Sequence, residues 1–466
     1  MSGATPRTLL VGFHTDLNQG GVRAALDRLQ EQGRPVPFLA LASRENFLGD
    51  RADAFLPDAR GFRQLDWAAS RAWPAPDGRT WERLRPAEAV AMKMMDRTQR
   101  ASRAGRAHES RKARWLQWAT FAHGFLRHHG IERLVHCNVP HFPFQYVLFE
   151  VARALGLEVR FLMQLQVKDT FMVADRIDGL YEPMGEALSA PAPEVALRPR
   201  MEQELARRTG RATPFYMTGK GVPALARLHA RQRRFFRGWL RSAGPRAAYR
   251  AARRRRGGVP EEGSPFVYLP LHLQPEATTL PLAGAYEDQR LIVETLVRAL
   301  PEGWHLVVKE NPKQRFDKRT ANFYETLAAH ERLRLVGRDE DSFGLLLRSR
   351  AVATATGTAG WEALCHGVPA LVFGNAFYQH APGARAIDSV ESASAALTAI
   401  HEGRFDEPTE AGCRAFLTNL QGLTFEGVSD SVYLRDSEVP VERSAEACAR
   451  AVEHALTGAA AAGPVG

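Results

Sequence analysis

Three short polar segments in the C-terminal half of the sequence carry the side chains best suited to chemistry. They are residues 274–279, 309–311 and 356–358, and each lies at or just after the end of a strand-like run: FVYLPLH, HLVVK and AVATAT. In open α/β sheets, ligands bind outside the carboxyl ends of the parallel strands. Three polar strand ends in one domain therefore predict one shared site.

The first polar segment places Gln274 and Glu276 on either side of Pro275, whose fixed φ stiffens the loop. A carboxylate at a strand end can act as a nucleophile, a general base or a stabiliser of an oxocarbenium-like centre. The structural alternative is that Glu276 caps the helix-like run that begins near Gly284. Thr278 is a further ligand-binding candidate in this loop.

The second polar segment delivers Lys309 from a strand-like run of Leu and Val. A Lys at this position can face a cleft and pair with a phosphate or a carboxylate, or it can be a solvated strand terminus. Asn311 and Pro312 form a turn under either interpretation.

The third polar segment is a Thr/Gly turn followed by a short helix-like run. Gly357 allows close backbone approach to a ligand, and Thr358 is predicted to be the helix N-cap. The positive end of such a helix attracts phosphate. Thr356, in the turn just before the helix, is a further candidate for binding it. Glu362, one turn further, can accept hydrogen bonds from a ribose. Both threonines and Glu362 can equally be ordinary capping and helix-dipole residues.

The elements that position these residues alternate regularly after residue 265. Strand-like FVYLPLH, HLVVKE, LRLVG, AVATAT and ALVFG are separated by helix-like runs, which predicts a doubly wound parallel sheet. The N-terminal half begins with a strand, an Asn/Gly-rich turn at residues 18–21, a helix closed by Gly33 and a second strand. Residues 62–127 are expected to be helical, and α/β alternation resumes near residue 132.

Four polar residues of the N-terminal half follow predicted strands. His14 and Asp16, on the first strand-to-helix turn, are candidate catalytic residues, and Asn18 and His141 are candidate acceptor-binding residues. Isolated His and Asp residues in loops are also common turn formers.

Length and composition indicate a globular protein of two domains, because 466 residues exceed one ordinary core. We expect the boundary between residues 258 and 259, with the last helix, near residues 444–457, packing back on the N-terminal domain. The sequence has no signal-peptide pattern and no membrane-spanning run, which predicts a cytoplasmic location. Its four scattered cysteines indicate buried thiols and no metal site.

The net charge of +10 comes from one segment, because residues 205–260 contain sixteen Lys and Arg and no Asp or Glu. At ~100° per residue, its apolar side chains fall within an arc of roughly 140°, opposite the arginines. Arg227–Arg256 is therefore predicted to form an amphipathic helix on an anionic membrane surface. Packing of this helix on the domain is the alternative. Nucleic acid is disfavoured as a partner because the segment has no recognised reader motif.

Together, the three polar segments resemble the capsule-polysaccharide glycosyltransferases of Gram-negative bacteria, which include the Kdo transferases of capsule lipid linkers and have the GT-B fold. The resemblance rests on QPEATT (274–279), KENP (309–312) and TGTAGWE (356–362). It extends from residue 266 to about residue 378.

This resemblance implies a nucleotide-sugar donor in the C-terminal domain, with CMP-Kdo favoured, and no cofactor. Glu276 falls at the Asp of the family's QxDxS pattern, which is assigned as the nucleophile, and Lys309 falls at the Lys of its KxHP pattern. The turn at 356–358 matches the stretch that holds the nucleotide phosphate. Two departures are a Glu for the shorter Asp and Asn311 for the usual His.

We therefore expect two Rossmann-like doubly wound domains that face a cleft, in a metal-independent glycosyltransferase peripheral to the inner membrane. Its acceptor is expected to be a glycan or glycolipid. A non-catalytic glycan- or nucleotide-binding protein and a nucleotide-sugar epimerase of the same fold are the alternatives. The expected donor-binding residues are Gln274, Thr278, Lys309, Asn311, Thr356, Gly357, Thr358 and Glu362.

Overall fold

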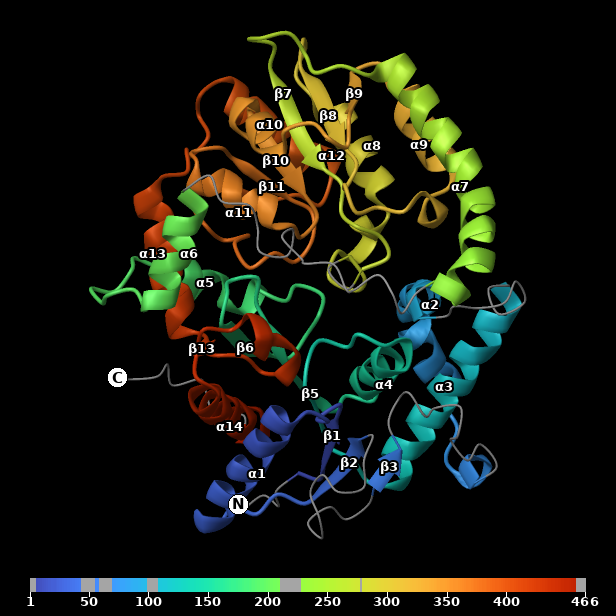
Figure 1. Cartoon of the computed structure of the whole chain (residues 1–466). Helices are drawn as coiled ribbons and strands as arrows, with labels where there is room; N and C mark the ends of the chain where they lie inside the picture. The colour runs from blue at the N-terminus through green and yellow to red at the C-terminus, as the bar shows by residue number, and fades with distance from the viewer. Residues whose placement is uncertain are drawn as a thin grey trace. The chain divides into compact units, whose positions relative to one another are not determined.

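The computed structural model describes residues 6–42, 55–57, 69–98, 108–209, 228–276 and 279–457. The chain divides into two compact units, each built around its own sheet (Figure 1). The first unit comprises Met1–Leu180 and Leu420–Gly466, and the second comprises Tyr181–Asn419.

The first unit contains a seven-stranded sheet in the order β13-β6-β5-β4-β1-β2-β3. The pairs from β5 to β3 are parallel, whereas β6 and β13 add antiparallel pairs at the edge. The strands are β1 (Thr8–Val11), β2 (Phe38–Ala42), β3 (Phe55–Pro57), β4 (Arg133–His136), β5 (Glu158–Gln164), β6 (Thr170–Ala174) and β13 (Phe425–Glu426). The helices are η3 (Ala69–Ala72), α1 (Asp16–Glu31), α2 (Gly78–Thr98), α3 (His108–His128), α4 (Pro143–Ala154), η10 (Ser431–Asp436) and α14 (Val441–Thr457).

The first helix begins earlier than the sequence indicates. α1 starts at Asp16, so residues 18–21 are helical and the expected Asn/Gly turn there is wrong. The backbone N–H of Thr15 donates to Asn18 Oδ1 at 3.0 Å, which caps the helix start. A Cβ on Gly21 would lie 2.7 Å from Cys448 Sγ. Gly21 is therefore needed for the close packing of α14 on α1, and the last helix packs on N-terminal elements as expected.

The second unit contains a six-stranded parallel sheet in the order β12-β11-β10-β7-β8-β9. Counted along the chain this order is that of the dinucleotide-binding Rossmann fold, and it reverses between β7 and β10. The strands are β7 (Phe266–Pro270), β8 (His305–Lys309), β9 (Leu333–Val336), β10 (Ala351–Thr354), β11 (Ala370–Val372) and β12 (Ala384–Ala386). The helices are η5 (Glu182–Met184), α5 (Gly185–Ser189), α6 (Pro199–Thr209), α7 (Leu228–Arg256), η8 (Gly284–Glu287), α8 (Gln289–Ala299), η9 (Phe316–Lys318), α9 (Ala321–Ala329), α10 (Ser342–Arg348), α11 (Thr358–Cys365), α12 (Val390–His401) and α13 (Glu410–Gly422), the last of which crosses the unit boundary.

Successive residues of β7 point to opposite faces of this sheet. Val267 and Leu269 pack with α8, α9 and α12, whereas Phe266 and Tyr268 pack with α10 and α11. Helices thus cover both faces (Figure 1). The expectation of two Rossmann-like, doubly wound α/β domains is confirmed, although β6 and β13 make the first sheet mixed.

The expected domain boundary after residue 258 falls inside the second unit. α6 packs on α11, and α7 packs on α9 and β9, where Tyr249 and Ala252 are buried in the core. The alternative that the basic helix packs on a domain therefore holds for its C-terminal half. The side chains of residues 228–241 lie outside the described residues.

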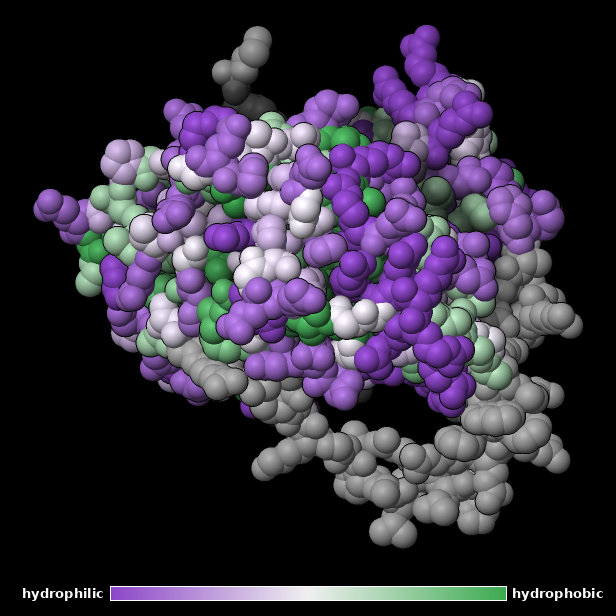
Figure 2. Space-filling view, turned by 90° about the horizontal axis from the view of Figure 1, so that it is seen from above, coloured by the Kyte–Doolittle hydropathy of each residue, from purple (hydrophilic) through white to green (hydrophobic). Residues whose placement is uncertain are grey.

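None of the helices in the described part of the chain is both long and apolar enough to cross a membrane. Seen from above, the surface is mostly hydrophilic, and its hydrophobic side chains form small, separate patches (Figure 2).

Two adjacent glycines of α1 provide a test of its packing. We expect Gly21→Ala to destabilise the protein by about 1–3 kcal/mol, because its Cβ overlaps Cys448 and the α14 backbone at Ala449. A Cβ on Gly20 meets no atom within 4 Å. The control Gly20→Ala should therefore stabilise the helix by roughly 0.5–1 kcal/mol. Equal effects of the two variants in chemical denaturation would contradict this packing.

Candidate functional site

The carboxyl ends of β7 and β10 meet where the strand order of the second unit reverses. His272, just beyond β7, lies with Nε2 3.0 Å from Thr354 Oγ1, and Thr354 Oγ1 accepts from the Gly357 N–H at 3.0 Å. Burial lowers the pKa of His272 to about 4, so its ring is neutral near neutral pH. The end of the FVYLPLH run and the Thr/Gly turn therefore lie side by side. That they share one ligand site stays a prediction.

Two glutamine side chains fix the backbone of the loop that leads to Glu276. Gln289 accepts from the His272 N–H at 2.7 Å and donates to the His272 carbonyl at 3.3 Å. Gln314 accepts from the Gln274 N–H at 2.8 Å and donates to the Gln274 carbonyl at 3.0 Å. Each amide satisfies both backbone groups of one residue, as a neighbouring strand would.

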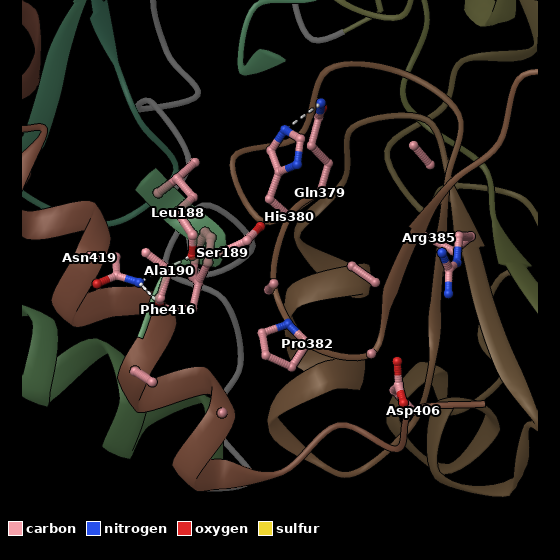
Figure 3. Close-up of a pocket in the computed structure, with 16 residues that line it drawn as sticks. Leu188, Ser189, Ala190, Gln379, His380, Pro382, Arg385, Asp406, Phe416 and Asn419 are labelled. Carbon is pink, nitrogen blue, oxygen red and sulfur yellow. Dashed lines mark hydrogen bonds between the residues drawn. The ribbon is translucent and has the colours of Figure 1, made fainter. Parts of the chain in front are cut away.

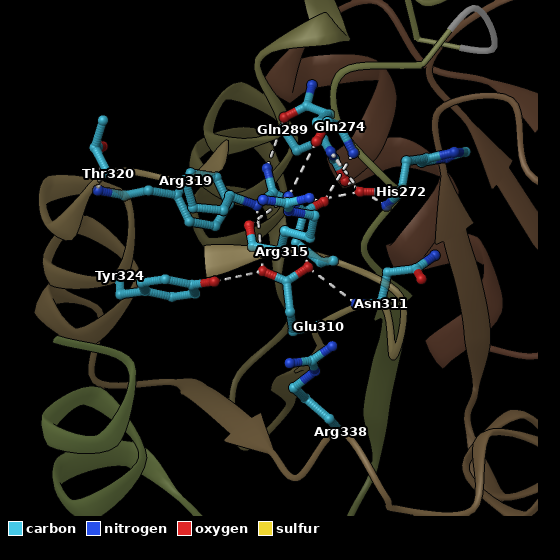
Figure 4. Close-up of polar contacts among 12 residues, drawn as sticks. His272, Gln274, Gln289, Glu310, Asn311, Arg315, Arg319, Thr320, Tyr324 and Arg338 are labelled. Atoms are coloured by element: carbon cyan, nitrogen blue, oxygen red, sulfur yellow. Dashed lines mark hydrogen bonds and ion pairs between the residues drawn. The ribbon is translucent and has the colours of Figure 1, made fainter. Parts of the chain in front are cut away.

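A buried ion pair joins this loop to the end of β8 (Figure 4). Glu310 is fully buried, and its two oxygens accept from Arg319 at 3.2 Å each and from the Tyr324 hydroxyl at 2.8 Å. Arg319 also donates to the His272 carbonyl at 3.2 Å and to Gln274 Oε1 at 2.6 Å. One guanidinium therefore holds the ends of both strands.

Glu276 is exposed at the end of this fixed loop. Its carbonyl accepts from the N–H groups of Thr279 and Leu280 at 3.2 and 3.0 Å. The next helical turn, η8, has Ala283 as its N-cap, so the alternative that Glu276 caps that turn is wrong. Thr278 lies outside the described residues.

Lys309 is only 4% exposed, which contradicts both the cleft-facing and the solvated interpretation. Its Nζ lies 2.6 Å from Ser342 Oγ. Burial lowers the pKa of Lys309, and the carboxylates of residues 339–341 oppose that shift. Asn311 Oδ1 accepts from the Lys313 N–H at 3.0 Å and so shapes the turn after β8.

The Thr/Gly turn lies at the start of α11, but its cap is not the expected one. Gly357, whose backbone is extended, is the N-cap, and Thr358 is the first helical residue. The Gly357 N–H donates to Thr354 Oγ1. The Thr356 N–H points to His272 Nε2 at 3.4 Å. Thr356 and Thr358 are both buried, so the turn packs against the protein at these two positions.

Glu362 of α11 forms an ion pair with Arg208 of α6. Burial raises the pKa of the Glu362 carboxyl, and Arg208 opposes that rise. The sequence assigned α6 to the N-terminal domain, so this contact was not anticipated.

The N-terminal candidates lie near the switch point of the first sheet, between β1 and β4. His14 is half-buried and its Nδ1 contacts the Gly12 carbonyl, while Asp16 is exposed at the start of α1. His141 is half-buried beyond β4. Asn18 is fully buried and caps α1, so the prediction that it binds an acceptor is replaced by a structural role.

A pocket of about 580 Å³ lies along the edge strand β12 of the second unit (Figure 3). It contains none of the expected site residues. Its polar and charged lining includes Ser189, Gln379, His380, Arg385, Asp406 and Asn419.

Sequence reasoning missed the residues that hold the site, namely Gln289, Gln314, Arg319, Tyr324 and Arg208. Most bind backbone groups or carboxylates far along the chain, and no local pattern marks such partners. Glu310 offered one usable signal, because a carboxylate at the end of an apolar strand needs a buried partner.

The buried ion pair predicts a large effect of one isosteric change. Glu310→Gln should destabilise the protein by about 3–5 kcal/mol, because it leaves the Arg319 cation buried and unpaired. The control Arg315→Gln breaks the nearby pair with Asp317, in which Arg315 is exposed, and should change stability by less than about 1 kcal/mol. Chemical denaturation of both variants measures this, and similar losses would contradict the assigned role of Glu310.

The family model of capsule polysaccharide biosynthesis proteins matches residues 279–384. This segment contains the KENP and TGTAGWE motifs, whereas Gln274 and Glu276 precede it. No curated protein sequence matches the chain.

The solved structures that match this chain include two kinds of enzyme. The beta Kdo 2,7 transferase KpsC of Thermosulfurimonas dismutans is 12% identical at a TM-score of 0.32, and the match covers 78% of this chain and 96% of that one. The UDP-GlcNAc 2-epimerase of Methanocaldococcus jannaschii is 9% identical at a TM-score of 0.28, covering 89% and 98%. The family match confirms the resemblance to capsule polysaccharide biosynthesis proteins over residues 279–384.

Proposed function

We propose that the chain is a glycosyltransferase that uses a nucleotide-activated sugar, CMP-Kdo or a similar donor, to build a capsule or another surface polysaccharide. The observation that carries the proposal is the family match over residues 279–384, which include the turn at the switch point of the second sheet. Ligands of doubly wound sheets bind at such switch points.

In this proposal the donor phosphate lies at the N-terminus of α11, where backbone N–H groups and the helix dipole favour an anion. Lys309 is buried and contacts Ser342, so in this proposal it supports the region from inside the domain and is not a direct partner of the phosphate. Asn311 shapes the turn where the family's His is usual, so any donor contact at this position is made by an amide.

Glu276 is the proposed nucleophile. Its carboxylate attacks the anomeric carbon while the bond to the nucleotide phosphate breaks, and the nucleotide leaves with the bonding electron pair. An acceptor hydroxyl then attacks the same carbon, loses its proton and releases Glu276. The fixed backbone from His272 to Gln274 supports this role, because precise positioning lowers the entropic part of the barrier.

The first unit is the proposed acceptor side. His14, Asp16 and His141 lie near the carboxyl ends of β1 and β4, and His14 or Asp16 is the proposed base for the acceptor hydroxyl. An epimerase would interconvert donor sugars without an acceptor. A non-catalytic binding protein would bind a nucleotide without turnover.

The test begins by measuring which of CMP, UDP and GDP stabilises the protein against heat. With the matching nucleotide sugar, Glu276→Gln should bind the donor almost as tightly as the wild type but lose at least about 100-fold in transfer rate. The control Glu302→Gln removes an exposed carboxylate on the turn before β8, at the opposite end of the sheet, and should transfer at the wild-type rate. More than about a tenth of the wild-type rate in Glu276→Gln would remove Glu276 from the chemistry, since such groups typically contribute more. Interconversion of the sugar without acceptor would favour the epimerase.

We further propose that the N-terminal half of α7 rests on an anionic membrane surface near the acceptor. The charge and apolar pattern of its sequence support this, whereas the half that contains Tyr249 packs on the domain. Each Arg near anionic lipid contributes about 1 kcal/mol, and salt screens the attraction.

Replacing Arg233, Arg234 and Arg237 by Gln should therefore sharply reduce co-flotation with anionic liposomes at low ionic strength. Transfer to a water-soluble acceptor analogue should not change. The control variant replaces Arg250, Arg254 and Arg255 by Gln, and so also removes three positive charges. These residues are exposed and lie in the half of α7 that packs on the domain. If both triple variants lose the same amount of liposome co-flotation, net charge alone explains the binding and the proposal is wrong. Unchanged co-flotation of both variants would also contradict the proposal.

A further inference from the structure

A chain of alternating charges connects α6 to the motif helix α11. Arg207 pairs with Glu204, Glu204 Oε1 lies 2.7 Å from Arg208 Nε, and Arg208 pairs through its other end with Glu362. The side chains of Glu204 and Arg208 are 1% and 3% exposed, whereas that of Glu362 retains 21%. This series of ion pairs is therefore buried at Glu204 and Arg208, and it ends at the Glu362 carboxylate, which solvent still reaches.

The orientation of Arg208 is fixed from both sides. Glu204 lies one turn earlier on the same helix and holds Nε, which leaves the far end of the guanidinium for Glu362. Burying several charges costs free energy unless each is paired, so such an arrangement is a weak source of stability. What it does provide is a fixed position for a single carboxylate on the helix that bears the Thr/Gly turn.

Other ionisable groups around this carboxylate add little positive charge. Glu204 raises the pKa of Glu362 and Arg207 lowers it, and the buried Tyr268 of β7 and Cys413 of α13 lie in the same region. Asp341 caps the neighbouring helix α10. Among the described groups around Glu362, Arg208 makes the direct contact that favours its ionised form.

We propose that Arg208 is a positioning residue that keeps Glu362 anionic and oriented to accept hydrogen bonds from the ribose hydroxyls of the nucleotide donor. This inference rests on the proposed function and adds α6 to the donor site. A carboxylate accepts from both hydroxyls of a ribose diol, whereas a protonated carboxyl must use one oxygen as a donor.

The sign of the pH dependence follows from the charge that Arg208 supplies. Binding of a ribonucleotide is strongest while Glu362 is ionised, and it weakens as the pH falls through the pKa of that group. Burial already raises this pKa, and loss of Arg208 removes the opposing charge. In Arg208→Gln the loss of affinity must therefore begin at a higher pH than in the wild type.

The experiment measures calorimetric affinity for CMP and for 2′,3′-dideoxy-CMP from mildly acidic to mildly alkaline pH. Arg208→Gln should weaken CMP binding about tenfold or more at the acidic end, the size of a lost charge-assisted hydrogen bond, and recover at the alkaline end. The CMP affinity of Arg208→Lys should lie between those of the wild type and Arg208→Gln. Lysine keeps the positive charge but lacks the planar guanidinium that contacts both glutamates. Glu362→Gln should bind CMP weakly at every pH, and the dideoxynucleotide should bind all variants alike.

A double variant, Glu204→Gln with Arg208→Gln, removes one charge of each sign and so tests the effect if the single variant does not fold. An unshifted pH profile in every folded Arg208 variant, with CMP binding still sensitive to Glu362→Gln, overturns the role of Arg208 alone. If an Arg208 variant loses equal affinity for CMP and for the dideoxynucleotide, Arg208 has only a structural role. That result also overturns the proposed role of Arg208. Failure of the wild type to bind CMP, UDP or GDP overturns both this inference and the proposed function.

Discussion

The buried pair of Glu310 and Arg319 is the interaction on which the second unit's site depends. Glu310 directly follows β8 and pairs with Arg319. Arg319 also donates to the His272 carbonyl and to the Gln274 side chain in the loop after β7. A carboxylate with no exposure is tolerated only when it is paired and hydrogen-bonded, so the two strand ends cannot separate without exposing or stranding a charge. The backbone of residues 272–274 and the end of β8 are therefore held together before any ligand binds.

These internal contacts limit which groups of the protein are left to bind an anionic donor. Three basic side chains that belong to or contact the motifs are already held by the protein: Lys309 by Ser342, Arg319 by Glu310 and Arg208 by Glu362. They act by fixing oxygen-bearing groups and turns instead of meeting the ligand as free cations. In the proposed mechanism, the start of α11 binds the phosphate and Glu276 and Glu362 act at the two sugars of the donor.

Local patterns predicted the fold of the second unit well, because each strand and helix carries its own signal. Buried parallel strands such as Leu306–Val308 are continuous apolar runs, and the intervening helices have amphipathic spacing. At the site, the sequence predicted which strand ends meet but not which residues hold them. Gln289 and Gln314 bind backbone groups of a loop, and a glutamine in a helix or turn gives no sign of such a partner. The early start of α1 was hidden because Asn18 and Gly21 are typical turn residues, and only α14 explains the glycine.

Hydrogen–deuterium exchange with and without the best-binding nucleotide sugar tests the central claim most directly, because it reports which backbone groups a ligand covers. The account predicts protection in residues 271–276 and at the start of α11, residues 356–360, with little change along β12. Protection centred on the pocket at residues 379–386, with the loops after β7 and β10 unchanged, would contradict it.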